Sequence, residues 1–281
     1  MMVIRFPPLP ADTARATESA FGNEHPYLKI GQRLEEVLFN LDIAVLASTD
    51  QNLVNSLWPY ALATILQYCE DLTDFQMANA TRTRLDLKYA LHLSLNFPGL
   101  EPSSLCRFRQ HLLRSQPGKD VFQKIARRVA DFVTNEDKHS TNVDVILSNV
   151  CTLRRWEMVT EMMSNAIESL AASQPEWLRS ITLPHWFKRY GKKVPAFPSQ
   201  RTSKNFKSMI LSVGQDGQYL LDAVEKSGLP AVKKMREIQI IAQAWQYQFN
   251  KEGDQLRLYA MSCSSCPGIF ETMTAKNLNH P

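Results

Sequence analysis

The sequence of 281 residues is short of glycine, cysteine and long apolar runs, and each shortage excludes a class of protein. Its ten glycines leave little material for glycine-rich phosphate loops, and none of the P-loop, dinucleotide, serine-hydrolase or zinc-protease motifs occurs. Five cysteines, an odd number at irregular spacing, argue against a secreted disulfide framework. No apolar run approaches the roughly 18 residues that span a bilayer. We therefore expect a cytoplasmic protein without a membrane partner.

Positive charge is concentrated in the second part of the sequence. Residues 1–100 contain 7 Lys and Arg against 11 Asp and Glu, whereas residues 101–281 contain 25 against 17. The stretch 177–215 combines eight Lys and Arg with aromatic residues and three prolines, and it has no acidic residue. Such a stretch fits contact with a nucleic-acid backbone, because its cations release counterions and its rings can stack on bases. It fits equally a solvated linker whose aromatic side chains anchor it to the neighbouring core.

Helical periodicity of apolar residues dominates the sequence, and strand-like alternation is almost absent. We therefore predict an all-α, multi-helical fold without an RNase-H-like core. The expected organisation is an irregular N-terminal arm over 1–26, a helical domain over 27–135, a second helical region over 143–250 that includes the basic stretch 177–215, and an irregular tail over 251–281. Within the first domain we expect one helix from Tyr27 to Leu46 and another that begins after an N-cap at Thr73.

The clearest helix start follows Pro102. Ser103 is expected to cap a helix whose Leu105, Phe108 and Leu112 share an apolar face. Arginines fall largely on the remaining surface, and two short helices precede this one. This arrangement is what a helix-turn-helix recognition helix requires, although it also describes any amphipathic surface helix.

Few residues suggest metal binding or catalysis. Cys263 and Cys266 have the C-x-x-C spacing that can hold zinc or cycle as a dithiol, but His280 is the sole further ligand nearby and a structural zinc site takes four. The six histidines are scattered singly along the sequence. No active site is evident from the residues themselves.

Three ordered blocks between residues 58 and 114 carry a family resemblance. These blocks are Leu66–Asp74, Arg82–Leu91 and Pro98–Arg109. They resemble the InsH-type N-terminal domain that precedes the DDE catalytic core of bacterial insertion-sequence transposases. A looser similarity to the helical region before that core extends through Leu153–Val159, Pro175–Leu178 and Pro184–Gly191.

The resemblance implies a catalytic site of three carboxylates that hold two metal ions for in-line attack on phosphorus. Asn142 aligns with the first catalytic Asp of the family, and Asp144, two residues away, is a weak candidate for that role. The other two carboxylates would lie in a strand-rich core beyond residue 250. The expectation is therefore a truncated or frameshifted, catalytically incomplete transposase that holds no cofactor. Divalent metal, expected to be Mg²⁺, would enter only with a core supplied elsewhere.

The expected partner is double-stranded DNA at the terminal repeats of an insertion sequence, with self-association that pairs two ends. The residues expected to contact DNA are Arg82, Arg84, Lys88, Ser103, Arg107, Arg109 and Arg114, with a second, non-specific patch at Lys188, Arg189, Lys192 and Lys193. Two alternatives stay open. In the first alternative, the chain is an active DDE transposase completed by another reading frame or chain. In the second, it is a helical protein-interaction module, an interpretation that the net negative charge of residues 1–100 favours.

Overall fold

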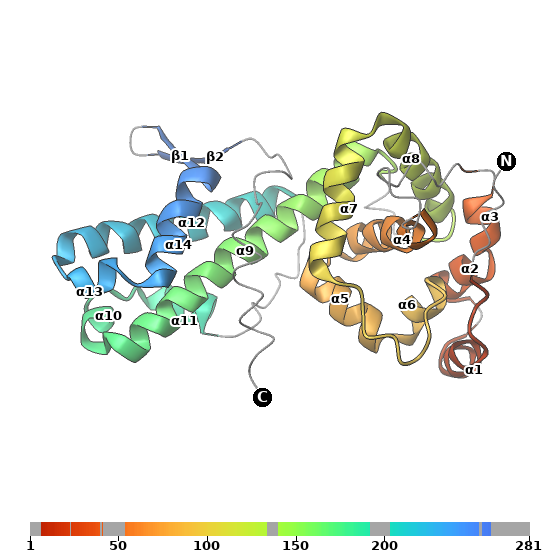
Figure 1. The fold of residues 1–281 in the computed structure, drawn as a ribbon, viewed down its shortest axis with the longest axis horizontal. Coiled ribbons are helices and arrows are strands. Elements are labelled where there is room, and N and C mark those ends of the chain that lie inside the picture. The colour runs from red at the N-terminus through yellow and green to blue at the C-terminus, as the bar shows by residue number, and fades with distance from the viewer. Residues whose placement is uncertain are drawn as a thin grey trace. The chain divides into compact units, whose positions relative to one another are not determined.

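The computed structural model describes residues 7–22, 24–39, 41, 54–133, 140–191, 203–252 and 255–259 (Figure 1). Within these ranges the chain is helical apart from loops and one short hairpin, which confirms the all-α prediction. No helix in the described part combines the length and the apolar character that crossing a membrane requires.

The chain divides into two compact units after Cys151, inside the long helix α9, Val143–Ser173. The sequence placed this division at the polar stretch before residue 143. The difference arises because α9 is continuous but contributes to two cores. Val143, Ile146 and Val150 belong to the first core, whereas the residues from Trp156 onward belong to the second.

The N-terminal unit is a bundle of short helices around one central helix. Its elements are α1 Ala11–Ala20, α2 Pro26–Gln32, α3 Leu34–Leu38, α4 Val54–Glu70, α5 Asp74–Thr83, α6 Leu85–Ala90, α7 Pro102–Arg114, α8 Gln116–Ala130 and the start of α9. Every residue of α4 from Ala61 to Tyr68 is buried, as expected of a helix surrounded by others. α5, α7 and α8 all pack against α4.

Local signals fix several helix ends in this unit. The Thr73 side chain accepts a hydrogen bond from the Gln76 amide, and the Gln76 side chain accepts one from the Thr73 amide, so the expected cap is a complete capping box. The expected helix over 27–46 is instead interrupted at Arg33, between α2 and α3. Residue 40 and residues 42–53, where that helix was expected to end, lie outside the described residues.

The expected irregular arm over 1–26 is wrong for residues 11–20, which form α1. This helix lacks an apolar stripe, so periodicity gave no signal. It is held instead by the buried Thr13 and Thr17, whose hydroxyls donate to the backbone carbonyls of Leu93 at 2.9 Å and Leu85 at 3.4 Å.

The C-terminal unit is a second helical cluster that ends in a hairpin. After the remainder of α9 come α10 Pro175–Ile181, α11 Pro184–Tyr190, α12 Ser203–Ser227, α13 Pro230–Lys233, α14 Arg236–Gln248, β1 Phe249–Glu252 and β2 Gln255–Leu258. The expected irregular tail is therefore wrong for its first residues, where β1 and β2 pair antiparallel. Gly217 of α12 lets α14 approach, because a Cβ there would overlap the Trp245 ring.

Candidate nucleic-acid interface

The helix α7 has a buried face and an outer polar face. Leu105, Phe108 and Leu112 are buried in the core of the N-terminal unit. α7 packs against α4, α5 and α8 (Figure 1). Arg107 and Arg114 are exposed. Because they are seven residues apart, they lie on one side of the helix about 10.5 Å apart along its axis. A polar stripe with the same periodicity is formed by Ser103, Arg107, Gln110 and Arg114.

Arg109 does not belong to this outer face, and its assignment to DNA contact is wrong. Its side chain is 0% exposed. One guanidinium nitrogen donates to Asp74 at 2.6 Å, and the other donates to Gln67 at 3.3 Å. Arg109 lies on the same face as Leu105 and Leu112, so the helix directs it into the core. There it joins α7 to α4 and α5.

Ser103 is not the N-cap that the sequence indicated. α7 begins at Pro102, and the cap residue Glu101 makes no side-chain cap. Proline is well suited to the first helical position, because the N–H group that it lacks would have no intrahelical partner there. The Ser104 hydroxyl instead accepts a hydrogen bond at 3.0 Å from Arg107, which lies on the outer face of α7.

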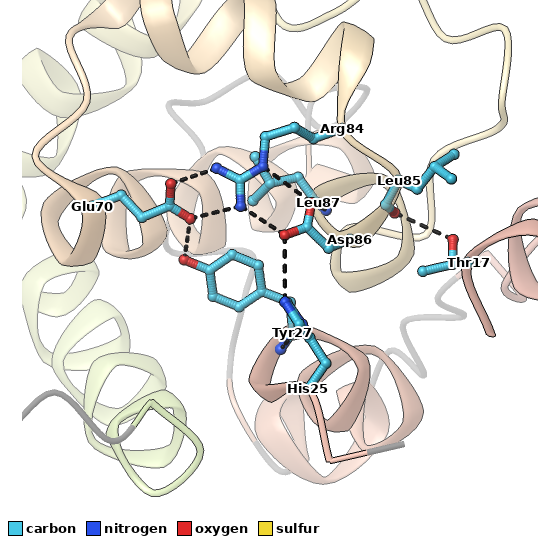
Figure 2. A network of polar contacts seen from close by, with 8 residues as sticks. All are labelled: Thr17, His25, Tyr27, Glu70, Arg84, Leu85, Asp86 and Leu87. Carbon is cyan, nitrogen blue, oxygen red and sulfur yellow. Dashed lines mark hydrogen bonds and ion pairs between the residues drawn. The ribbon is translucent and has the colours of Figure 1, made fainter. Parts of the chain in front are cut away.

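Arg84 is held in an ion-pair network that Figure 2 shows. It makes two hydrogen bonds to the carboxylate of Glu70 on α4 and two to that of Asp86 on α6. Tyr27 of α2 donates to the same Glu70 carboxylate, and the His25 ring lies 3.8 Å from Asp86. Burial lowers the pKa of Arg84, but its bonds to Asp86 and Glu70 outweigh burial and raise it. We therefore assign Arg84 to joining α2, α4 and α6 rather than to contacting DNA.

Lys88 is also a structural residue, and its expected DNA contact is wrong. Its side chain is buried, and the ammonium donates to the backbone carbonyls of Ser94 at 3.2 Å and Phe97 at 3.1 Å. Burial lowers the pKa of Lys88. These two bonds fix the loop that leads into α7.

Arg82 stays on the surface beside that same loop. It is exposed on α5 and donates to the Asn79 side chain at 2.9 Å. A Cβ added at Gly99 would lie 3.2 Å from the Arg82 Cβ, so the loop passes directly against this part of α5. Arg82 therefore lies near the start of α7. α6 and residues 91–101 separate α5 from α7, and the helix-turn-helix assignment stays a prediction.

The four residues expected to form the second, non-specific DNA-binding patch also differ in their surroundings. Lys188 is exposed on α11. Arg189 binds the buried Asp216 of α12, which also accepts a hydrogen bond from the Tyr190 hydroxyl at 2.6 Å. Burial lowers the pKa of Arg189, but Asp216 and Tyr190 more than compensate and raise it. Lys192 and Lys193 lie outside the described residues.

The candidate catalytic segment begins α9. The Asn142 side chain accepts hydrogen bonds from the amides of Asp144 at 2.9 Å and Val145 at 3.3 Å, as an N-cap does. Asp144 forms an ion pair with Lys119 of α8 at 3.0 Å. Across the described ranges, no three His, Cys, Asp or Glu side chains gather as metal ligands would. Cys263 and Cys266 lie outside those ranges.

The sequence interpretation missed the buried acceptors that hold these arginines, Asp74 and Asp216. The position of Asp74 within the block Leu66–Asp74 was the one sign in the sequence that this residue matters. No local pattern pairs it with Arg109, which lies 35 positions away.

Residues 20–111 match the family model described as a transposase domain, DUF772. No curated protein and no solved structure matches the chain. The matched range extends from the end of α1 into α7 and contains the Arg109–Asp74 pair, the Arg84 network and Arg107. The N-terminal region of this chain is thus similar to a transposase domain.

Proposed function

We propose that the N-terminal unit binds double-stranded DNA through the outer face of α7 and recognises the ends of an insertion sequence. The observation that carries this proposal is the position of Arg107 and Arg114, both exposed, on the side of α7 opposite its buried face. A single helix fits the major groove of B-DNA, and arginine is the residue that most often reads guanine there.

Local charge supports the proposal although residues 1–100 are net acidic. Apart from Arg109, which is buried and paired with Asp74, α7 and α8 together contain six Lys and Arg and one acidic residue, Asp120. This concentration of positive charge favours contact with phosphates on both sides of a groove. Arg82, beside the start of α7, is suited to contact the DNA backbone, and Lys188 of the C-terminal unit is a candidate for non-specific backbone contact.

The test measures binding of the full chain to a duplex that carries the terminal repeat and to a scrambled duplex of equal length. Arg107→Ala should weaken binding to the repeat by roughly 5- to 150-fold, the range that loss of one base-reading arginine gives, and Arg114→Ala should weaken binding to both duplexes. The matched control is Arg15→Ala, which removes an exposed arginine from α1. It should bind like the unchanged chain.

Two outcomes would contradict the proposal. Unchanged affinity of both α7 variants would show that DNA does not contact this face. A complete lack of DNA binding by the unchanged chain at low salt would favour the protein-interaction module.

Because end pairing requires two bound copies, we also propose self-association on DNA. Complexes that contain a single chain at saturating repeat DNA would contradict this part alone.

A further inference from the structure

We propose that the outer face of α11 binds single-stranded DNA, with the Phe187 ring stacked on an unpaired base and Lys188 in contact with the neighbouring phosphate. This site lies in the C-terminal unit and is distinct from the duplex-binding face of α7. It does not depend on the function proposed for that face.

The exposure of Phe187 is the first observation. The residue is 76% exposed, the highest value among the large hydrophobic residues that the structure describes. Its neighbours Trp186 and Tyr190 are buried in the second core. The helix thus uses two aromatic residues for packing and leaves the third on the surface.

The helix that carries Phe187 is firmly attached to α12. Asp216 accepts from Arg189 and Tyr190, and the His185 ring nitrogen lies 2.8 Å from its other oxygen. Trp186 packs edge-to-face against Tyr190 and Tyr219, with ring centroids 6.2 and 6.1 Å apart. A ring presented by an anchored helix loses little conformational freedom when a base stacks on it.

The positive charge of α11 indicates that the partner is a nucleic acid. The seven residues of α11 include Lys188 and Arg189 and no Asp or Glu, and Lys188 is exposed next to Phe187. The nearby Asp216 is already paired with Arg189, so it offers little repulsion to a phosphate. An aromatic ring in a positive environment is the combination that single-strand-binding proteins use. The bases of a duplex are already stacked on one another, which is why the proposal specifies a single strand.

An exposed phenylalanine can also mark a contact with another protein, and the chemistry of the substitution separates the two cases. Leucine retains apolar area but has no ring face for a base. Tryptophan retains the ring. If the partner is a base stacked on the ring, Phe187→Trp should preserve binding and Phe187→Leu should not. If the partner is an apolar protein surface, Phe187→Leu should preserve binding.

The experiment measures binding of the full chain to a single-stranded thymine oligonucleotide by fluorescence anisotropy. Phe187→Ala and Phe187→Leu should weaken binding by roughly 5- to 100-fold, the loss expected for one stacked base, while Phe187→Trp retains affinity. Lys188→Ala should lower the salt dependence by about 0.7 in log–log slope, as expected for one phosphate on a single strand. The matched control is Tyr247→Ala on α14, which removes another exposed aromatic residue, 57% exposed, from the same unit.

Three results would overturn the proposal. They are absence of single-strand binding at low salt, full affinity of Phe187→Leu, and equal losses in Phe187→Ala and Tyr247→Ala. A loss of self-association in Phe187→Ala with unchanged oligonucleotide binding would assign the residue to a protein contact instead. The Arg107→Ala, Arg114→Ala double variant should keep single-strand binding, so failure of the α7 proposal and failure of this one are distinguishable.

Discussion

The Arg109 guanidinium and the Asp74 carboxylate meet at 2.6 Å inside the N-terminal unit, with side chains 0% and 3% exposed. The pair joins the middle of α7 to the first turn of α5. Gln67 of α4 completes the arrangement, because its amide donates to Asp74 at 2.9 Å. The orientation of the proposed DNA-binding helix therefore depends on a charge pair that DNA does not reach.

The first prediction concerns this pair. Arg109→Met should destabilise the chain by about 3–5 kcal/mol, because it leaves the Asp74 carboxylate buried without its cation. The double variant Arg109→Met, Asp74→Leu should recover part of that loss, since no uncompensated charge remains. Urea unfolding measures both. Arg107→Ala, which alters an exposed arginine of the same helix, is the control and should stay within about 0.5 kcal/mol of the unchanged chain. A double variant no more stable than the single one would contradict this account.

The second prediction concerns the loop before α7. Gly99 has φ +102°, and an added Cβ would lie 2.6 Å from the Ala78 carbonyl oxygen. Gly99→Ala should therefore destabilise the chain by about 1–3 kcal/mol through backbone strain. Gly22→Ala is the matched control, because nothing lies within 4 Å of its added Cβ. Thermal unfolding compares the two, and equal melting temperatures would contradict the prediction.

The third prediction concerns alkaline pH. Burial and the neighbouring Glu70 raise the pKa of Tyr27 above its ordinary value of about 10. Above that pH the hydroxyl ionises in the unfolded chain but keeps its proton in the folded one. The free energy of unfolding should therefore fall as pH rises, by up to about 1.4 kcal/mol per pH unit for this residue.

Urea unfolding between pH 8 and 11 measures this slope. Tyr27→Phe should lower the slope, and the exposed Tyr247→Phe should leave it unchanged. Tyr190 contributes in the same direction, because burial and its bond to Asp216 raise its pKa as well. A slope that is the same in all three chains would show that Tyr27 ionises equally in both states.

The fourth prediction separates base reading from phosphate contact on α7. Recognition helices contact base edges with their N-terminal residues. Arg107 is closer to the helix start than Arg114, the last residue of α7. Arg107→Ala should therefore reduce the preference for repeat over scrambled DNA. Arg114→Ala should weaken both equally and lower the log–log salt dependence by about 0.9. The reverse pattern would exchange the two roles.

The sequence predicts those features that depend on neighbouring residues. The capping box of Thr73 and Gln76 was visible in part because both partners lie within four positions. The apolar face of α7 was visible because Leu105, Phe108 and Leu112 follow helical spacing. The all-α class follows from many such local patterns.

The roles of the cations were not predictable in this way. Arg109 and Lys88 were expected to contact DNA, and a buried cation needs a partner that the sequence around it does not identify. Their partners, Asp74 and the carbonyls of Ser94 and Phe97, reach them only in the folded chain. Asp144 was considered as a metal ligand, yet its partner Lys119 lies 25 positions earlier.

The attachment of α1 has a practical consequence for dividing this protein. A fragment trimmed to residues 20–111 would remove Thr13 and Thr17, leaving the backbone oxygens of Leu85 and Leu93 without their donors. It would also remove α8, which packs on the central helix α4. A fragment intended to fold on its own should therefore start before Pro10, whose carbonyl accepts from the Ala14 amide, and should extend beyond α8.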